Sequence, residues 1–372
     1  MTRTVHTVRF ADARSLVHAP GETVDLVVTS PPYPMIAMWD AAFTSLDASI
    51  GPALAAEDGE AAFEAMHAVL DEVWRGCFQA LRPGGIACIN IGDATRSLGG
   101  EFRLWPNHAR ILLGAAAIGF HALPDILWRK PTNAPNKFLG SGMLPAGAYV
   151  TYEHEYVLVL RKGRKREFCS REAKLERAKS AFFWEERNAW FSDVWLDLRG
   201  EQQSLDDAES RGRSGAFPRE LAYRLVNMFS VRGDVVLDPF LGTGTTLTAA
   251  AAAGRSSLGY EIDRGLEPVV RRNAGASIEL GRRRAAERIA AHGAFVRERA
   301  AAGKPLQRWN ASLRMPVMTR QESLLEIAIP DACGESSNAG ADLTFEVSYI
   351  ASALAAAPPA SIEPASSPAP IA

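Results

Sequence analysis

Two apolar runs in this chain end in turns of different kinds, and together they restrict the fold more than any other feature. The first run, Val24–Thr29, stops before Pro31 and Pro32, because prolines cannot continue a sheet ladder. The second run, Asp234–Asp238, leads through a glycine loop into Thr245–Ala253, which has the composition of a helix. A strand followed by a turn and a helix is the crossover unit of a parallel sheet.

The same alternation of strands and helices continues along the chain. Apolar residues at helical spacing predict a helix over Ala61–Leu81, followed by a glycine turn and a strand over Ile86–Ile91. Further predicted helices are 107–119 and 217–230, and further predicted strands are 125–129, 156–160 and 257–261. We therefore predict an α/β fold with a doubly wound, mostly parallel, Rossmann-like sheet.

Composition favours a globular protein of the cytoplasm. A hydrophobic fraction of 47% and a charged fraction of 23% are ordinary for a soluble domain. The first residues lack the apolar core and cleavage site of a signal peptide, and no apolar run is long enough to span a bilayer. The four cysteines are scattered without a CxxC pair, which argues against a metal cluster and fits a reducing compartment.

Positive charge is concentrated in two stretches although the net charge is only -2. One stretch runs from Arg271 to Arg288. The other is a dense cluster formed by Arg161, Lys162, Arg164, Lys165 and Arg166. Either stretch fits a solvated face, and either could supply the phosphate contacts that DNA binding needs.

The late glycine loop has the pattern of a cofactor site. Gly242 and Gly244 follow a strand and open a helix, where glycine lets the backbone turn tightly and approach a ligand. Glu261 ends the next predicted strand nineteen residues after Gly242, where an acidic residue binds ribose hydroxyls in dinucleotide-binding sheets. Asp238 could pair with the ammonium of S-adenosylmethionine, and Phe240 could pack on its adenine.

Rival interpretations of this loop are weaker. A phosphate-binding P-loop needs a lysine after its last glycine, and Thr245 stands there. A nicotinamide fingerprint needs a third glycine, and Leu247 occupies that place. A plain strand-to-helix turn remains open, and so does a cofactor without a pyrophosphate, which has no need of the third glycine.

The early motif, Thr29–Tyr33, has the groups needed to hold an aromatic amine. Exocyclic amines of bases are poor nucleophiles because their lone pair is delocalised into the ring. Hydrogen-bond acceptors such as Ser30 Oγ and the Pro31 carbonyl oxygen could draw the amine toward tetrahedral geometry. Tyr33 offers a face on which an extruded base could stack. The alternative is a plain turn at the end of a strand.

The two motifs in this order resemble the β-class amino-methyltransferases of DNA, in which the base-binding motif precedes the cofactor motif. Thr29–Tyr33 matches the catalytic motif in its serine form, and Asp238–Thr246 matches the cofactor motif. Segments 81–85, 153–159 and 217–221 resemble further segments of the family in the same order. The resemblance covers most of residues 5–263.

The resemblance implies roles for individual residues. The target base would be held by Ser30, Pro31, Pro32 and Tyr33. S-adenosylmethionine would be contacted by Asp12, Phe217, Pro218, Asp238, Pro239, Phe240, Gly242, Gly244, Thr245 and Glu261. Asp12 stands in an Ala-Asp-Ala turn where the family has Gly-Asp. Asn90 and Asp93 would lie near the site, although Asp93 equally fits a helix cap.

Within this family, Ser-Pro-Pro-Tyr points to the N4 amine of cytosine, with the N6 amine of adenine as the alternative. Methylation of RNA or of a protein amide is a more distant alternative, because a related clamp serves there. A protein that binds nucleic acid without catalysis and a nicotinamide oxidoreductase fit the intact motifs less well. Methylation at cytosine C5 needs a cysteine nucleophile, whereas Cys77 and Cys88 fall within a predicted helix and strand.

The same reasoning predicts the organisation of the chain and its partners. Residues 1–275 would form the catalytic domain, with a loop over the site at 34–59 and a basic and aromatic insert at 161–213 that could recognise DNA. A helical extension is predicted for 276–330 and a mostly disordered tail for 331–372. Base-edge contacts could come from 34–59, 131–147 and 161–190. The expected partner is double-stranded DNA without a metal; a cognate restriction endonuclease and a homodimer both remain open.

Overall fold

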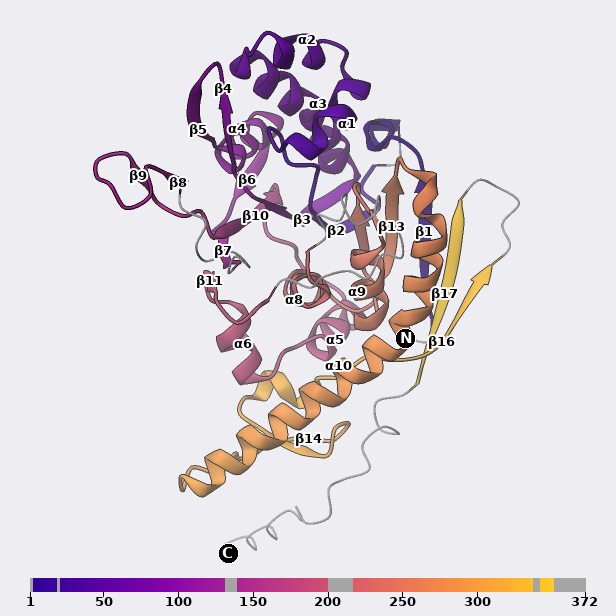
Figure 1. Ribbon diagram of the computed structural model, residues 1–372. Coiled ribbons are helices and arrows are strands. Elements are labelled where there is room, and N and C mark those ends of the chain that lie inside the picture. Colours follow the sequence, from indigo (N-terminus) through magenta and orange to yellow (C-terminus); the bar gives the residue numbers. More distant parts are fainter. Residues whose placement is uncertain (1–2, 19–20, 131–138, 200–216, 337–341, 351–372) are drawn as a thin grey trace, which may run out of the picture.

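The computed structural model describes residues 3–18, 21–130, 139–199, 217–336 and 342–350, and most of its strands join one mixed sheet (Figure 1). The sheet has the order β11-β7-β10-β3-β2-β12-β13-β1-β17-β16, with β6 also paired to β10. Its strands are β1 (Arg3–Phe10), β2 (Val24–Thr29), β3 (Leu81–Ile91), β6 (Phe120–Ala122), β7 (Ile126–Arg129), β10 (His154–Lys162), β11 (Val194–Trp195), β12 (Val235–Asp238), β13 (Ser256–Glu261), β16 (Ile329–Ser336) and β17 (Leu343–Ile350).

The other elements are helices and three small hairpins. The α-helices are α1 (Asp40–Leu46), α2 (Ile50–Ala55), α3 (Gly59–Ala80), α4 (Asn107–Ile118), α5 (Arg171–Lys179), α6 (Trp184–Trp190), α8 (Arg219–Phe229), α9 (Thr245–Ala253) and α10 (Glu267–Ala301). The short 3-10 helices are η1 (Ala13–His18), η2 (Ala37–Trp39), η3 (Arg264–Leu266) and η4 (Arg320–Leu324). The hairpins pair β4 (Ala94–Leu98) with β5 (Glu101–Trp105), β8 (Leu139–Gly140) with β9 (Ala148–Tyr149), and β14 (Arg308–Asn310) with β15 (Met315–Val317).

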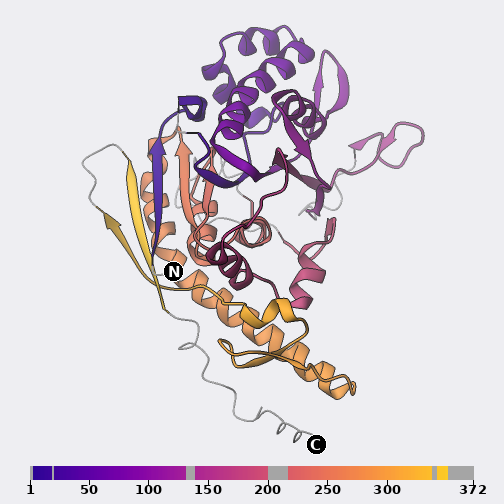
Figure 2. The same cartoon turned by 180° about the vertical axis from the view of Figure 1, so that it is seen from behind.

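The central strands are buried on both faces, as their nearly continuous apolar sequences require. In β2, Val27 packs with α3 on one face, while Leu26 and Val28 pack with α8 and α9 on the other. Figures 1 and 2 show α3 and α4 on one side of these strands and α8 and α9 on the opposite side. The doubly wound, mostly parallel α/β fold predicted from the sequence is confirmed.

The direction of chain winding reverses between β2 and β12, which are parallel neighbours. From β12 the chain crosses through α9 to β13, and from β2 it crosses through α3 to β3 on the other side. Such a switch point leaves a crevice at the carboxyl ends of the strands, where doubly wound sheets bind ligands. Both sequence motifs begin at this point, because Thr29 ends β2 and Asp238 ends β12.

The predicted tail requires a correction, since residues 329–350 contain β16 and β17. Leu343, Phe345 and Val347 alternate along β17 and are buried, which is the period-two pattern of a strand. β17 pairs antiparallel with β1 and so covers an edge that would otherwise expose unpaired backbone groups. The remaining predicted tail, 351–372, lies outside the described residues.

The predicted loop at 34–59 is also different in the structure. It contains η2, α1 and α2, and Phe43 and Ile50 anchor these helices in the main core. Its proline, glycine and aspartate residues favour a loop locally, but the two buried apolar side chains hold short helices against α3.

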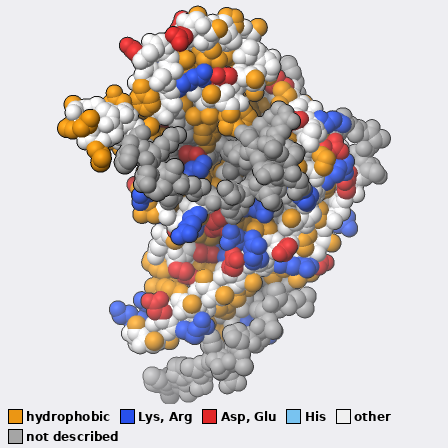
Figure 3. Space-filling model, in the orientation of Figure 1, with side chains coloured by type: hydrophobic (Ala, Val, Ile, Leu, Met, Phe, Trp, Pro, Cys, Tyr) orange, Lys and Arg blue, Asp and Glu red, His pale blue; other side chains and the backbone are white. Residues whose placement is uncertain are grey.

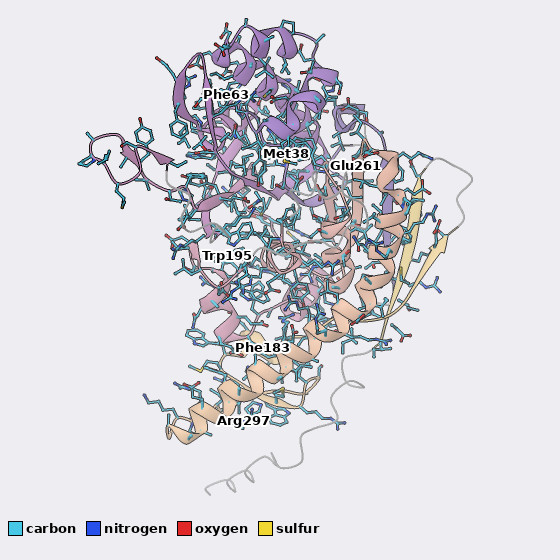
Figure 4. The ribbon with its side chains drawn as sticks, in the orientation of Figure 1. Met38, Phe63, Phe183, Trp195, Glu261 and Arg297 are labelled. Atoms are coloured by element: carbon cyan, nitrogen blue, oxygen red, sulfur yellow. The ribbon has the colours of Figure 1, made fainter. Side chains whose placement is uncertain are left out.

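Three aromatic residues of the predicted insert, Phe183, Trp190 and Trp195, are part of the core, whereas Trp184 is 41% exposed. Trp190 and Trp195 are buried against α8, and Phe183 stacks on His292 of α10 at 3.9 Å between ring centroids. Phe183 lies in the lower half of Figure 4 and Trp195 near its middle, both away from Glu261. Their burial shows that the aromatic pattern reflects packing, and residues 200–216 of this insert lie outside the described residues.

The helical extension predicted for 276–330 is an α-helix only as far as Ala301, where α10 ends, and β14 and β15 follow it. This part of α10 projects past the sheet (Figure 1), with Ala285, His292 and Val296 buried. None of the described helices combines the length and apolar character needed to cross a membrane.

Candidate active site

The two sequence motifs are joined by a short hydrogen bond. Thr29 Oγ1 donates to Asp238 Oδ1 at 2.6 Å, and the backbone N–H of Phe240 donates to the same oxygen at 3.0 Å. Asp238 is only 3% exposed, and burial raises its pKa to about 6. The Asp238 carboxylate, which the sequence predicts to contact the cofactor, therefore lies where the two motifs meet.

The raised pKa of Asp238 predicts how the stability of the protein changes with pH. Its pKa in the folded chain is about 6, above the ordinary value of 3.8, so folding favours the protonated form. Its contribution to stability is then greatest below about pH 4 and is lost as pH rises through about 6, a change of about 3 kcal/mol at 1.36 kcal/mol per unit. We expect Asp238→Asn to remove this change from the free energy of unfolding, measured with urea between pH 4 and 7. If Asp238→Asn keeps the pH dependence of the wild type, the change in stability comes from other groups.

The glycine loop has the backbone that the sequence predicts. Gly242 and Gly244 have φ angles of +53° and +87°, in the left-handed region that favours glycine. A side chain at Gly242 would meet only the Phe240 carbonyl, at 4.0 Å, so the conformation rather than crowding requires glycine there. Gly244 is the N-cap of α9, whose first residue, Thr245, is buried.

Glu261 ends β13 beside this loop. Its Oε2 accepts from the backbone N–H of Gly242 and its Oε1 from that of Asp263, each at 2.8 Å. Burial raises the pKa of Glu261. The carboxylate thus fixes the loop against the neighbouring strand, at the carboxyl end of β13 (Figure 4).

Two more predicted cofactor positions lie at the start of α8. Phe217 and Pro218 are buried, and Pro218 is the N-cap. Arg219 Nη2 donates to Asn273 Oδ1 at 3.5 Å, and Asn273 Nδ2 donates to the Thr243 carbonyl at 2.7 Å. Asn273 of α10, which the sequence did not indicate, therefore links the start of α8 to the glycine loop.

The remaining predicted cofactor residues lie at or near the same edge. Phe240 is half-buried and makes an edge contact with Trp74 at 5.9 Å, and Pro239 is buried. Asp12 follows β1, whose Phe10 is in register with Glu261. Its carboxylate pairs with Arg14 at 2.7 Å and is about one third exposed. Asp12 is thus near Glu261, and its carboxylate is engaged within its own turn.

The early motif is held by a network of polar side chains. Ser30 Oγ donates to Tyr33 Oη at 3.2 Å, and Tyr33 Oη donates to Glu155 Oε2 at 3.0 Å. Asn90 Nδ2 donates to both, at 2.9 Å to Tyr33 and 2.7 Å to Glu155. Burial and the Glu155 carboxylate raise the pKa of Tyr33 well above its ordinary value, so the phenol stays protonated. Pro31 is buried and Pro32 is half-buried beside this network.

Glu155 is a second site residue that sequence reasoning missed. It was seen only as part of a strand, β10, which runs antiparallel to β3, with Tyr156 opposite Ile91. The amino end of β10 therefore meets the carboxyl ends of the parallel strands and brings Glu155 to Tyr33. Glu155 Oε1 also accepts from Lys130 Nζ at 2.9 Å. The one sequence signal that could have indicated Glu155 was its position as an acidic residue at the start of a late apolar strand.

Two expectations from the sequence are resolved by the contacts. Asp93 accepts from the backbone N–H of His108 at 3.0 Å, so it pairs with a donor in the first turn of α4, although the N-cap residue of that helix is Pro106. Cys77 and Cys88 are buried, and burial raises the pKa of both thiols, as expected for core residues.

The basic cluster at 161–166 lies at the opposite edge of the sheet. It begins with the last two residues of β10, Arg161 and Lys162, and the end of that strand lies roughly 26 Å from His154. Lys162 Nζ donates to the Leu81 carbonyl and Arg166 pairs with Asp234, while Arg161 Nε donates to the Gly163 carbonyl. Arg164 and Lys165 are exposed at the same end. DNA contact by Arg161, Lys162, Arg164, Lys165 and Arg166 stays a prediction, and this placement puts the cluster at the far edge from Ser30.

Two hairpins lie at the same edge as Ser30. β4 begins just after β3 ends, and β9 leads into the amino end of β10. Phe102 and Tyr149 stack between the hairpins, with centroids at 5.4 Å and planes at 4°. The β8–β9 hairpin carries exposed Met143 and Leu144 (86% and 69%), and hydrophobic side chains gather on this projection in Figure 3.

Comparison with known proteins agrees with this geometry. A family model described as DNA methylase matches residues 24–271. The chain is 45% identical over 329 residues to Type II methyltransferase M.MthZI of Methanothermobacter thermautotrophicus, covering 88% of this chain and 91% of the relative. It is 47% identical over 283 residues to Type II methyltransferase M.MjaI of Methanocaldococcus jannaschii, covering 73% and 92%.

A solved structure from Thermus thermophilus has the same fold. That protein, assigned as a DNA modification methylase, was crystallised in complex with S-adenosyl-L-methionine. It is 35% identical to this chain, with a TM-score of 0.55, and the match covers 72% of this chain and 94% of that one.

Proposed function

Because this chain belongs to the DNA methylase family of N4 and N6 amino-methyltransferases, we propose that it methylates the exocyclic N4 amine of cytosine in double-stranded DNA. The observation that carries the proposal is the Thr29–Asp238 hydrogen bond at the switch point. It brings the base-binding motif and the cofactor motif to one crevice, although 209 residues separate the two side chains in sequence. The serine form of the early motif supports cytosine.

The residues around the glycine loop fit S-adenosylmethionine. The positive φ angles of Gly242 and Gly244 shape a loop open to a ligand, and Glu261 on the next strand has the acidic group suited to ribose hydroxyls. We propose that these three residues, with Phe240 and Phe217, hold the cofactor. When bound, S-adenosylmethionine supplies an electrophilic methyl group on a positively charged sulfur.

The early motif would hold and activate the base. Ser30 Oγ and the Pro31 carbonyl oxygen accept hydrogen bonds from the amine's N–H groups, which localises the nitrogen lone pair. Tyr33 presents its ring to an extruded base, with its hydroxyl fixed by Glu155 and Asn90. Since the phenol of Tyr33 stays protonated, it is a positioning group and not the base that removes the amine's proton.

The two hairpins beside Ser30 are the proposed DNA-facing surface in place of the basic cluster. They flank the crevice, and residues 139–152 contain no charged side chain that would repel phosphates. Exposed apolar side chains of the kind found on the β8–β9 hairpin pack against base edges or enter between base pairs.

Replacing the hairpin tip tests this surface. We expect Met143→Ser with Leu144→Ser to weaken binding to cognate duplex about tenfold, while the slope of affinity against salt stays unchanged because no phosphate contact is lost. The matched control is Arg164→Ala with Lys165→Ala at the opposite edge, expected within about twofold of wild type. Fluorescence anisotropy at several salt concentrations measures both. If the control pair weakened binding and the hairpin pair did not, the assignment would be reversed.

The proposed reaction is tested by identifying the product. DNA from cells that express the chain is sequenced with a method that resolves modified bases, and its nucleosides are separated by mass spectrometry. N4-methylcytosine at one recurring sequence is the expected result. N6-methyladenine would move the same amine chemistry to the other base, and unmodified DNA with folded protein present would contradict the proposal.

A further inference from the structure

We propose that Glu155 sets the direction of the hydrogen bonds through Tyr33 to Ser30, so that the site accepts an amino base and rejects an oxo base. Glu155 would thus be a positioning and specificity residue, acting through Tyr33. The inference rests on the proposed function, since it assumes that Ser30 meets the target base.

The chain of hydrogen bonds begins at a group that can only accept. Glu155 is 9% exposed, and Lys130 Nζ lies 2.9 Å from its Oε1, so an ionised carboxylate is paired with an ammonium. An ionised carboxylate has no proton to donate. Tyr33 Oη, 3.0 Å from Glu155 Oε2, must therefore use its single proton in that bond.

Tyr33 can then only accept from its other neighbours. Asn90 Nδ2 donates to Tyr33 Oη, and it also lies 2.7 Å from Glu155 Oε2, so the amide nitrogen and not its oxygen faces the carboxylate. Ser30 Oγ, at 3.2 Å, must donate as well. With its proton directed to Tyr33, the half-exposed Ser30 hydroxyl offers only lone pairs to a ligand.

This polarity matches one kind of base and opposes another. Cytosine and adenine carry an amine with N–H donors, whereas uracil and hypoxanthine carry a carbonyl oxygen at the same positions. A carbonyl facing the Ser30 lone pairs would leave both acceptors unpaired, and sites that leave buried polar groups unpaired discriminate by up to about 10⁴-fold. The hydrogen bonds from Glu155 through Tyr33 to Ser30, which we call the relay, separate amino from oxo bases. They treat the two amino bases alike.

The decisive variant is Glu155→Gln. A glutamine can donate to Tyr33 through its amide, which allows the phenol proton to turn toward Ser30 and reverses the relay. Binding is measured with S-adenosylhomocysteine present, on duplexes that carry the recognition site found for the wild type. Each duplex holds either the amino target base or its oxo counterpart, which is uracil for cytosine and hypoxanthine for adenine.

We expect the wild-type preference for the amino duplex to fall at least tenfold in Glu155→Gln. In methyl transfer, kcat should fall about 10- to 100-fold while KM for S-adenosylmethionine stays within twofold. The matched control is Glu153→Gln, two residues earlier and paired with Arg129 at 3.2 Å, which should change neither quantity. Tyr33→Phe keeps the ring and removes the relay, so it should also lose the preference, and adding Glu155→Gln to it should cause no further loss.

An unchanged amino preference in Glu155→Gln and in Tyr33→Phe would overturn the relay, even if kcat fell. This outcome is distinct from failure of the proposed function, which would be a wild-type chain that transfers no methyl group to any duplex. The binding comparison measures the amino preference without catalysis, so it separates a failed relay from a loss of methyl transfer in the variants. Thermal unfolding of each variant confirms that it is folded, and Tyr33→Phe gives the answer if Glu155→Gln is not.

Discussion

Ser30→Ala should lower methyl transfer to DNA by about 10²- to 10³-fold, the range found when one preorganised polar group is removed from a reacting centre. The alanine leaves the strand end and both prolines in place, and Ser30 is half-exposed with its one described contact to Tyr33. Folding and cofactor affinity should therefore remain, while the amine loses an acceptor that localises its lone pair. Tritium transfer from labelled S-adenosylmethionine measures the rate.

Two comparisons make this result specific. Ser348→Ala, at a half-exposed serine of β17 opposite Arg3 at the amino end of β1, should keep the wild-type rate. Affinity for S-adenosylmethionine, measured by calorimetry, should be the same in both variants. A Ser30→Ala enzyme within threefold of the wild-type kcat would remove Ser30 from the proposed clamp and leave the Pro31 carbonyl as the acceptor to test.

Arg288→Met should destabilise the protein by about 3–5 kcal/mol, because it leaves a buried carboxylate without its partner. The guanidinium of Arg288 binds both oxygens of Glu186, at 2.5 and 2.8 Å, and both side chains are about nine-tenths buried. This pair connects α10 to α6. Chemical denaturation followed by circular dichroism measures the loss.

The control for Arg288 is another arginine of the same helix. Arg283 pairs with Glu287 at 3.7 Å, and both side chains are about half exposed, so Arg283→Met should change stability by less than about 0.5 kcal/mol. A double variant, Arg288→Met with Glu186→Leu, should recover most of the loss because the lone buried charge is gone. Equal losses of stability in Arg288→Met and Arg283→Met would show that the buried Arg288–Glu186 pair stabilises the protein no more than an exposed pair does.

Much of the fold was predictable because its signals are local. The bounds of β2 and α9 agree with the apolar runs and glycines that predict them, and Gly119, with a φ of +117°, ends α4 as its place in the sequence suggests. β1 and β17 were not predicted. Each is stabilised by pairing with strands distant in sequence, such as β13 with β1, so the contribution of that pairing cannot be read from the segment alone.

The candidate site was predictable in part. Ser30, Gly242 and Glu261 stand at strand ends, and the carboxyl ends of parallel strands meet at one edge. The clustering of charged residues in the sequence predicted the functional surface less well. Arg166 and Arg288 both belong to the positive stretches of the sequence, yet each is bound to a carboxylate inside the fold.

The sequence by itself determined where strands end, which backbone positions need glycine and which side chains stand at those turns, because neighbouring residues decide these properties. The tertiary structure alone decided that Asp238 faces Thr29, that Glu155 reaches Tyr33, and that the basic cluster lies at the far edge from Ser30. All three depend on strand order and on the antiparallel direction of β10, which long-range packing selects.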